Sequence, residues 1–398
     1  MSILHATTNL DLDDTATGYA YRSTEELKSA RLLFQLLRYG ALVRMGNNIG
    51  ALALRLKLPI EGVLRNTLGR LFLGGTDLES TLPTLRRLSS HGVSVMLDYA
   101  VEASSHASQQ EATLEEYLRM IEFSSKHRDL VSFIAIKLTA LAPPLLWEKL
   151  SSQAPLSPFL LSAKEAFESR FARLVTAAIR SGVPLMVDAE ESWIQSAIDR
   201  VIEEYMERNN KDSIFIYTTI QMYRRDRLDY LKALLSRAST YKVGVKLVRG
   251  AYVEKERKRA KERNYPDPIQ PTKAATDIAY DAALMLCLEN IERVGLCIAT
   301  HNRTSCMKAV QYVLMQGISP SHPHLSFSQL YGMADPLSFG LARAGFRVVK
   351  YVPYGPVEKA FPYLARRAEE NSSLSDQSGR ELRWIKEELA RRKRISQS

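Results

Sequence analysis

Residues 346–371 read FRVVKYVPYGPVEKAFPYLARRAEEN and contain one complete strand–turn–helix unit. The first seven residues have the length and the valine content of a buried strand, and Pro353, Gly355 and Pro356 interrupt the pattern. Pro356 suits a helix entrance, because the first helical residues do not need their N–H groups for intrahelical hydrogen bonds. The stretch therefore predicts a strand that is joined to a helix by a short turn.

The same unit recurs through most of the chain. Apolar runs of strand length cover residues 93–99, 131–138, 184–190, 213–221, 242–248, 295–301, 324–330 and 346–352. Helical periodicity follows them at residues 114–126, 164–180, 193–208, 228–238, 272–294, 304–315, 336–344 and 357–371. Continuous apolar strands that alternate with helices indicate a parallel sheet, and eight units indicate a distorted, TIM-like (βα)8 barrel of the α/β class. Residues 143–162 and 254–271 are predicted to be long loops.

The residues before and after these units predict additional segments. We expect disorder from residue 1 to about residue 20, and then a helix entrance at 23–26 that lacks a complete capping box. Helical periodicity covers residues 24–58, 60–72 and 78–90. The predicted organisation is a disordered start and helical region at 1–90, the barrel at 91–372, and a basic C-terminal helix at 373–398.

Composition excludes several classes of protein. The 398 residues carry a formal net charge of +10, which suits nucleic acid, a membrane surface or an anionic ligand without choosing among them. The chain has three cysteines, Cys287, Cys297 and Cys306. Their number is odd and no two of them have CxxC spacing, so neither a disulfide framework nor a zinc site is expected. The polar N-terminus lacks a signal-peptide core, and charges interrupt the apolar window at 32–58. We expect a cytoplasmic protein, with a trimmed mitochondrial chain as the alternative.

The helix predicted after the last strand carries an unusual stripe. Tyr363, Arg366, Arg367 and Glu370 follow the spacing i, i+3, i+4 and i+7, which places them on one helical face. Two guanidiniums beside a carboxylate suit bidentate binding of a ligand carboxylate, with Glu370 holding one arginine in place. A solvated basic face has the same spacing, so the pattern alone leaves both interpretations open.

Polar residues also collect where the predicted strands end, which is where barrel enzymes place their active sites. They are Lys137, Asp188, Ala189 and Glu190, Gln221, Lys246, Arg249 to Tyr252, Thr300 to Asn302, Gln329 to Gly332, and Tyr351. Lys137 could form a Schiff base, bind a carboxylate or reach water, and Asp188 could pair with a nearby cation. His301 could be a packed core histidine, and no second His or Asp stands at metal-ligand spacing from it. No GxGxxG or P-loop motif is present.

Five motifs in order make the pattern specific. They are LMVDAE at 185–190, KLVRGAY at 246–252, ATHN at 299–302, QLYGM at 329–333, and YVPYGPV with PYLARRAEEN between 351 and 371. Together they resemble the FAD-dependent proline dehydrogenase family of the monofunctional type, and the resemblance extends from about residue 90 to residue 371. It implies a (βα)8 barrel with its last helix over the mouth.

The resemblance also implies a reaction. The expected activity is oxidation of L-proline to Δ1-pyrroline-5-carboxylate, the first step of proline catabolism to glutamate, with hydride transfer from proline C5 to N5 of FAD. Electrons then pass to a quinone or another acceptor. The chain has no room for a fused aldehyde dehydrogenase, so a separate pyrroline-5-carboxylate dehydrogenase would act next. No nucleic-acid partner is expected, because no DNA-binding helix-turn-helix or ribbon arm is recognisable.

The resemblance assigns roles to individual residues. Asp188 and Lys246 match positions assigned to the active site. Positions that bind the substrate carboxylate match Lys137, Arg366 and Arg367, and positions around the proline ring match Leu330, Tyr351 and Tyr363. FAD contacts match Ala189, Gln221, Arg249, Gly250, Ala251, Tyr252, Thr300 and His301. Many relatives have Arg in place of Lys246 and Lys in place of Arg249, which keeps both charges but changes the hydrogen-bond geometry.

Two interpretations compete at the level of sequence. The basic tail at 380–394 is expected to be a helix packed back on the barrel, and the alternative is peripheral docking on an anionic membrane near a quinone pool. For the whole chain, the rival function is that of an aldolase with Lys137 as the Schiff-base lysine, which would need no flavin.

Overall fold

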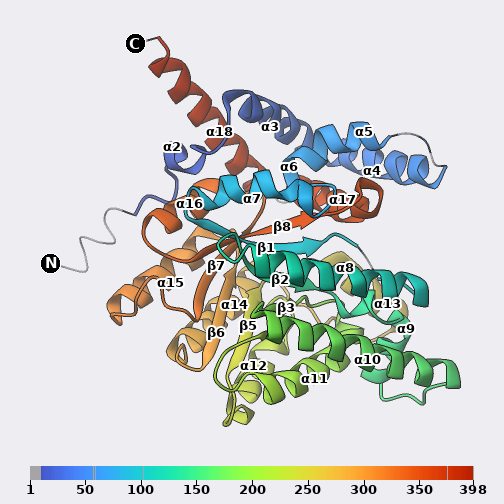
Figure 1. Ribbon diagram of the computed structural model, residues 1–398. Helices are drawn as coiled ribbons and strands as arrows, with labels where there is room; N and C mark the ends of the chain where they lie inside the picture. The colour runs from blue at the N-terminus through green and yellow to red at the C-terminus, as the bar shows by residue number, and fades with distance from the viewer. Residues whose placement is uncertain (1–9, 57, 59, 102, 374, 398) are drawn as a thin grey trace. The chain divides into compact units, whose positions relative to one another are not determined.

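Eight parallel strands close into a barrel in chain order (Figure 1). The structure is a computed structural model, and it describes residues 10–56, 58, 60–101, 103–373 and 375–397. The strands are β1 Val93–Tyr99, β2 Val131–Ile136, β3 Leu185–Val187, β4 Ile216–Gln221, β5 Val243–Val248, β6 Val294–Ala299, β7 Leu325–Leu330 and β8 Val348–Tyr354. Every predicted strand overlaps an observed one, so the (βα)8 prediction is confirmed.

The chain divides into two compact units. One unit runs from residue 103 to Ser328 and contains β2 to β6 and most of β7. The other contains the described residues up to Val101 together with those from Gln329 onward, including β1 and β8.

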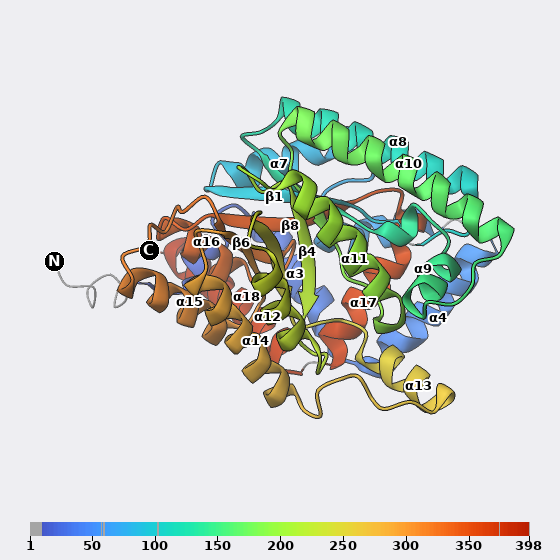
Figure 2. The same cartoon turned by 90° about the horizontal axis from the view of Figure 1, so that it is seen from below.

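In the 103–328 unit, neighbouring strands pair in parallel and helices cover them. Lys246 on β5 lies opposite Thr219 of β4 and Cys297 of β6. Helices α8 and α10 lie side by side in Figure 2. The helices of this unit are α8 Ala107–Lys126, η3 Leu138–Ala140, α9 Pro144–Ser151, α10 Pro158–Ser181, α11 Ser192–Asn209, α12 Arg227–Arg237, α13 Val253–Arg263, α14 Lys273–Glu289 and α15 Arg303–Met315.

Two predicted loops of this unit are instead partly helical. Residues 143–162 contain α9 and the start of α10, and residues 254–271 contain most of α13. Pro144 and Pro158 occupy first helical turns, where proline is tolerated, so they do not break these helices. The sequence of α13, VEKERKRAKER, is so highly charged that it has no apolar stripe to reveal it.

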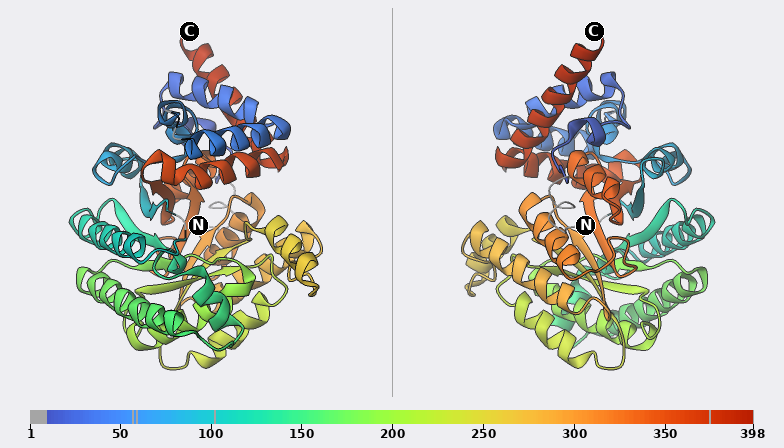
Figure 3. Two further views of the ribbon diagram at one scale, coloured as in Figure 1. Left: turned by 90° about the vertical axis from the view of Figure 1, so that its right-hand side faces the viewer. Right: turned by 90° about the vertical axis from the view of Figure 1, so that its left-hand side faces the viewer.

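In the other unit, helices from both ends of the chain surround β1 and β8. These two strands pair in register from Val93 opposite Val348 to Tyr99 opposite Tyr354. The helices are α2 Thr15–Gly18, α3 Thr24–Leu37, α4 Gly40–Arg55, α5 Glu61–Leu64, η1 Arg65–Gly69, α6 Arg70–Phe72, η2 Glu79–Thr81, α7 Leu82–Ser89, α16 Asp335–Arg343, α17 Val357–Ser373 and α18 Ser375–Ile395. Both views of Figure 3 show the blue N-terminal helices beside the red C-terminal helices.

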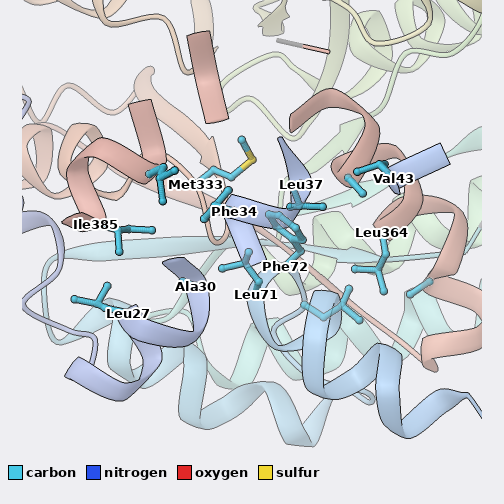
Figure 4. Packing of buried hydrophobic residues seen from close by; sticks show 14 of the residues in the cluster. Leu27, Ala30, Phe34, Leu37, Val43, Leu71, Phe72, Met333, Leu364 and Ile385 are labelled. Carbon is cyan, nitrogen blue, oxygen red and sulfur yellow. The ribbon is translucent and has the colours of Figure 1, made fainter. Parts of the chain in front are cut away.

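The core of this unit joins the two ends of the chain. Figure 4 shows Leu27, Phe34 and Phe72 packed in one cluster with Leu364 and Ile385. On α18, Leu382 and Trp384 are also buried in the cluster, and Trp384 is 1% exposed. The C-terminal segment is therefore helical, as predicted. It packs mainly on α3, with α2 and α17 also against it, whereas packing on the barrel was expected. Its buried apolar residues are not available for a membrane.

The N-terminal region corrects two expectations. A complete capping box precedes α3, because Ser23 Oγ accepts the Glu26 N–H at 3.1 Å and Glu26 Oε2 accepts the Ser23 N–H at 2.7 Å. Residues 15–18, expected to be disordered, form α2 because Asp14 caps its free N–H groups. Residues 1–9 of that prediction lie outside the described part. No helix within the described ranges combines the length and the apolar character needed to cross a bilayer.

Candidate active site

Two lysines face one carboxylate where β2, β3 and β5 end. Asp188 directly follows β3, and its backbone N–H donates to the Ile136 carbonyl at 2.9 Å. The Lys246 ammonium donates to Asp188 Oδ1, and Lys137 Nζ lies 3.9 Å from Oδ2. Because Lys246 is only 4% exposed, the Asp188 carboxylate is an important partner for this buried ammonium. The structure thus brings three predicted residues together and confirms that Asp188 is an ion partner.

A second carboxyl lies two residues beyond Asp188. Glu190 accepts a hydrogen bond from Thr139 Oγ1 at 2.6 Å, and its backbone N–H donates to Gln195 Oε1 at 2.7 Å. Burial raises the pKa of Glu190 to about 7, although the Thr139 hydrogen bond opposes the shift. Glu190 stands in the LMVDAE motif, and sequence reasoning assigned it no role, although it is the last residue of the predicted strand at 184–190.

Arg249 is held by polar groups on all sides at the end of β5. Its Nε lies 2.6 Å from Asp277 Oδ1, and its two Nη atoms donate to Thr300 Oγ1 at 2.7 Å and Ser305 Oγ at 3.0 Å. The guanidinium also lies over the Tyr280 ring, 4.1 Å from its centroid. Two predicted cofactor contacts, Arg249 and Thr300, therefore lie next to each other. Asp277 and Ser305 could not be paired with them from sequence.

Gly250 has a structural reason to be glycine. Its φ is +123°, and a Cβ at this position would lie 2.4 Å from the Tyr223 ring. The backbone here therefore lies directly against Tyr223, with no side chain between them. Ala251 is exposed and Tyr252 caps α13, so these predicted residues continue the same surface.

One buried polar atom at the end of β4 has no hydrogen-bond partner in the described part of the chain. Gln221 is 3% exposed, and its Oε1 accepts no hydrogen bond. Buried side-chain oxygens are normally satisfied, so an acceptor of this kind suits a donor supplied by a ligand. Ala189 after β3 is also buried, and His301 after β6 is half-buried. These are further strand-end positions from the predicted cofactor set.

In the other unit, α17 carries the predicted stripe. Arg367 Nη2 lies 2.5 Å from Glu370 Oε1, and its Cζ lies 5.3 Å from the Tyr363 ring centroid. Arg367 is 7% exposed, and its Nε has no partner among the described residues. Arg366, beside it, is half-buried. Burial of Arg367 disfavours a fully solvated basic face, and carboxylate binding by the stripe stays a prediction.

Burial also affects the phenol and the carboxyl of this stripe. It raises the pKa of Tyr363, whose hydroxyl has no hydrogen-bond partner among the described residues. Burial raises the pKa of Glu370 as well, and the Arg367 guanidinium opposes that shift. The Glu370 side chain is still 27% exposed, so this end of the stripe keeps some contact with solvent.

Leu330 ends β7, whereas Tyr351 lies in the middle of β8 in the same unit and not at the strand end where it was predicted. Leu330 is the last residue of β7 and packs against the core cluster, and the Tyr351 carbonyl on β8 accepts the Tyr331 N–H at 2.9 Å. Lys350 fixes the segment after β7, because its Nζ donates to the carbonyls of Leu330 at 3.3 Å and Met333 at 2.5 Å.

Sequence reasoning missed this lysine and its partners. Lys350 is fully buried, with its Nζ 2.8 Å from Asp335 Oδ1. Arg22 Nε lies 3.1 Å from Asp335 Oδ2, which also accepts from Tyr21 at 2.8 Å. The one signal in the sequence is the alternation of side chains along β8. Successive residues of a strand point to opposite faces, so Lys350 lies on the opposite side of the strand from Tyr351.

Comparisons with known proteins show the family to which this sequence is related. A family model described as proline dehydrogenase matches residues 81–380. The chain is 36% identical over 334 residues to carbapenem antibiotics biosynthesis protein CarD from Pectobacterium carotovorum subsp. carotovorum, covering 83% of this chain and 86% of CarD. It is 30% identical over 434 residues to mitochondrial proline dehydrogenase 1 from Dictyostelium discoideum, covering 96% of this chain and 75% of that protein.

Solved structures match at the level of the fold. Proline utilization A from Bdellovibrio bacteriovorus, inactivated by N-propargylglycine, superposes with a TM-score of 0.71 at 21% identity. The match covers 94% of this chain and 41% of that larger protein. The family match, the sequence relatives and the barrel agree with the resemblance found in the motifs, and the chain belongs to the proline dehydrogenase family.

Proposed function

We propose that this chain oxidises L-proline to Δ1-pyrroline-5-carboxylate with FAD as its cofactor. The observation that carries the proposal is Arg367, a buried guanidinium that is anchored by Glu370 and keeps an unpaired Nε. It stands in the PYLARRAEEN motif of a chain that belongs to the proline dehydrogenase family. A buried cation with a free donor is suited to an anionic ligand.

The substrate carboxylate is assigned to Lys137, Arg366 and Arg367. Each supplies a positive charge, and Arg367 is already oriented by Glu370 before any ligand binds. Preorganised charge lowers the entropic cost of binding and fixes the orientation of the amino acid. Leu330, Tyr351 and Tyr363 are assigned to the proline ring, with two aromatic surfaces and one aliphatic side chain that exclude water.

The residues of the 103–328 unit suit a flavin nucleotide. Gln221 offers a buried acceptor that has no donor among the described residues, Gly250 supplies backbone that carries no side chain of its own, and Arg249 offers a fixed positive charge. Ala189, Ala251, Tyr252, Thr300 and His301 complete the assigned FAD contacts. When bound, FAD would supply the hydride acceptor for proline C5.

Asp188 and Lys246 are assigned to the active site itself. The carboxylate pairs with the buried Lys246 ammonium and fixes its direction inside the barrel wall. A fixed ammonium in a dry site favours electron-rich groups bound beside it.

The remaining parts of the proposal concern partners and location. Electrons would pass to a quinone or a similar acceptor, and a separate pyrroline-5-carboxylate dehydrogenase would use the product. No nucleic-acid partner is proposed. The Dictyostelium relative is named as mitochondrial, whereas a cytoplasmic location for this chain remains a prediction.

Turnover with an artificial electron acceptor tests the proposal against its rival. FAD-loaded protein should reduce the acceptor with L-proline and not with D-proline, and the product should be trapped as a cyclic imine. Borohydride in the presence of carbonyl substrates should leave Lys137 unmodified. A protein that shows no proline-dependent reduction but is trapped through Lys137 would be an aldolase.

A further inference from the structure

The segment that joins β7 to α16 has an unusual backbone conformation. We call it the 330–335 loop, because it runs from the last residue of β7 to the first residue of α16. Gly332 and Ala334 have φ angles of +81° and +52°. A Cβ at Gly332 would lie 2.1 Å from the Leu71 carbonyl oxygen, so glycine is required there. Ala334 has a Cβ that disfavours the left-handed region, and the loop therefore needs contacts that keep it in this shape.

Two buried charged side chains from other elements supply such contacts. The Lys350 ammonium on β8 donates to the carbonyls of Leu330 at 3.3 Å and Met333 at 2.5 Å. Glu381 on α18 accepts the Ala334 N–H at 2.9 Å through Oε1. Lys350 is 0% exposed and Glu381 is 1% exposed, so water does not compete for these bonds. The backbone of the loop is thus fixed at three positions by one donor and one acceptor.

Stability alone is a weak reason for charges at these two positions. Lys350 has Asp335 at 2.8 Å, but the nearest guanidinium nitrogen of Arg380 is 3.9 Å from Glu381 Oε1. Burial raises the pKa of Glu381 to about 7, although the Arg380 guanidinium opposes the shift, so a carboxylate is costly here. Apolar side chains often replace buried ion pairs without a loss of stability. They cannot, however, make directional hydrogen bonds to the backbone of the loop.

The loop carries a residue that is assigned to the proline ring. Leu330 is its first residue, and its half-buried side chain packs against the same core cluster as Tyr363. The loop also contacts α17, because Asn371 Nδ2 lies 3.7 Å from Met333 Sδ and donates to the Arg367 carbonyl at 2.8 Å. A change in the shape of the loop would therefore move Leu330 and disturb a contact with the helix that bears the arginine stripe.

We propose that Glu381, together with Lys350, is a positioning residue for the ring of the substrate. By fixing the 330–335 loop, these side chains place Leu330 against a five-membered ring and make the site selective for ring size. Helix α18 thereby takes part in substrate recognition, although none of its residues was assigned to the substrate. The inference rests on the proposed function, because it takes Leu330 as part of the proline site.

Selectivity between L-proline and L-pipecolate, whose ring is larger by one methylene, tests the proposal. FAD-loaded wild-type protein should favour L-proline in kcat/KM about tenfold or more. Glu381→Met removes the acceptor for the Ala334 N–H, so this ratio should fall about threefold or more and the KM for proline should rise. Glu381→Gln keeps an acceptor of the same length and should retain the ratio within about twofold of wild type.

The matched control is Glu388→Met on the same helix. Glu388 is 0% exposed, and it accepts hydrogen bonds at 2.7 Å from both Arg391 and Arg392. Its removal also leaves buried charge without a partner, so Glu388→Met should lower the unfolding temperature as Glu381→Met does. The ratio of kcat/KM for the two substrates should stay at the wild-type value, because Glu388 holds α18 and not the loop.

A milder variant keeps the test decisive if Glu381→Met does not fold. Glu381→Asp retains the charge but withdraws the acceptor by one methylene, and it should lower the ratio in the same direction. An unchanged ratio in the folded variants would overturn the proposal, as would an equal loss in Glu388→Met or a wild type with no preference for L-proline. If wild-type protein does not oxidise L-proline at all, the proposed function fails and the inference fails with it.

Discussion

Arg367 Nη2 lies 2.5 Å from Oε1 of Glu370, one helical turn further along α17. This contact uses one edge of a buried guanidinium and leaves Nε without a partner in the described chain. The Tyr363 ring lies beside the same guanidinium, at 5.3 Å. Arg367 therefore has a fixed orientation and at least one N–H group that makes no hydrogen bond among the described residues. Such an arginine is suited to bind the carboxylate of a ligand.

Replacing either arginine of α17 should weaken the binding of proline. Arg366→Ala and Arg367→Ala should each raise the KM for proline on the order of tenfold or more, because a charge-assisted pair is lost. Arg367→Lys should show a smaller rise, since the charge remains but the planar fork does not. Steady-state kinetics with varied proline measures the effect.

The control for this prediction is Arg383→Ala on α18. Arg383 pairs with Glu387 at 3.7 Å, and its side chain is 60% exposed. Its removal should leave the KM unchanged. If Arg366→Ala and Arg367→Ala also leave the KM unchanged, neither residue binds the substrate.

Removing the carboxylate between the lysines should affect stability and activity differently. Asp188→Asn leaves the buried Lys246 ammonium unpaired, so the free energy of unfolding should fall by about 3 kcal/mol and kcat/KM on the order of 100-fold. Asp188→Asn with Lys246→Met should recover most of the stability but none of the activity, because the unpaired charge is gone. Urea unfolding and proline turnover measure the two effects.

An exposed pair provides the comparison for Asp188. Asp229 pairs with Lys232 at 3.5 Å, and its side chain is 85% exposed. Asp229→Asn should change neither stability nor activity measurably. Full activity in Asp188→Asn would remove Asp188 from the active site.

Tyr351 should set the preference between two substrates. If its side chain closes against the proline ring, a ring hydroxyl at C4 meets an aromatic surface with no space for it. We expect kcat/KM to be higher for L-proline than for trans-4-hydroxy-L-proline, and Tyr351→Ser should reduce the difference. A wild-type preference for hydroxyproline would contradict this role, as would a Tyr351→Ser variant with unaltered selectivity.

Glu190 should make stability depend on pH. Because burial raises its pKa from 4.5 to about 7, the folded protein binds more protons than the unfolded chain between these values. The contribution of Glu190 to stability must therefore fall as the pH rises through this window. Relative to wild type, Glu190→Gln should gain up to about 3 kcal/mol in free energy of unfolding between pH 4.5 and pH 8.

Urea unfolding across this pH range measures the difference between the two proteins. Glu204→Gln, at a side chain that is 52% exposed, is the matched control and should follow the wild-type curve. A Glu190→Gln curve that runs parallel to wild type at all pH values would mean that folding does not raise the pKa of Glu190.

The barrel could be predicted from sequence because its strands are continuous apolar runs, as in 93–99 and 346–352. Helix α13 could not, because its charges hide any periodicity, and α9 was obscured by its prolines. The capping box before α3 was present in the sequence, with Ser23 and Glu26 at the required spacing, and was misjudged.

Part of the site could be predicted because barrel enzymes carry their functional residues at the C-terminal ends of the strands. This rule found Lys137, Asp188 and Lys246, which the structure brings together. It could not find the partners on other elements, such as Asp277, which lies 28 residues beyond Arg249 on a helix. Nor could it reveal that Lys350 is buried, because that depends on Asp335 and on Arg22 near the other end of the chain.

The visible spectrum of the purified protein, recorded before and after L-proline is added without oxygen, tests the central claim most directly. We expect the absorption bands of an oxidised flavin, and we expect L-proline to bleach them. Bands that bleach only with another donor would contradict the proposed substrate. Protein that binds no flavin even after incubation with FAD would contradict the proposed function as a whole.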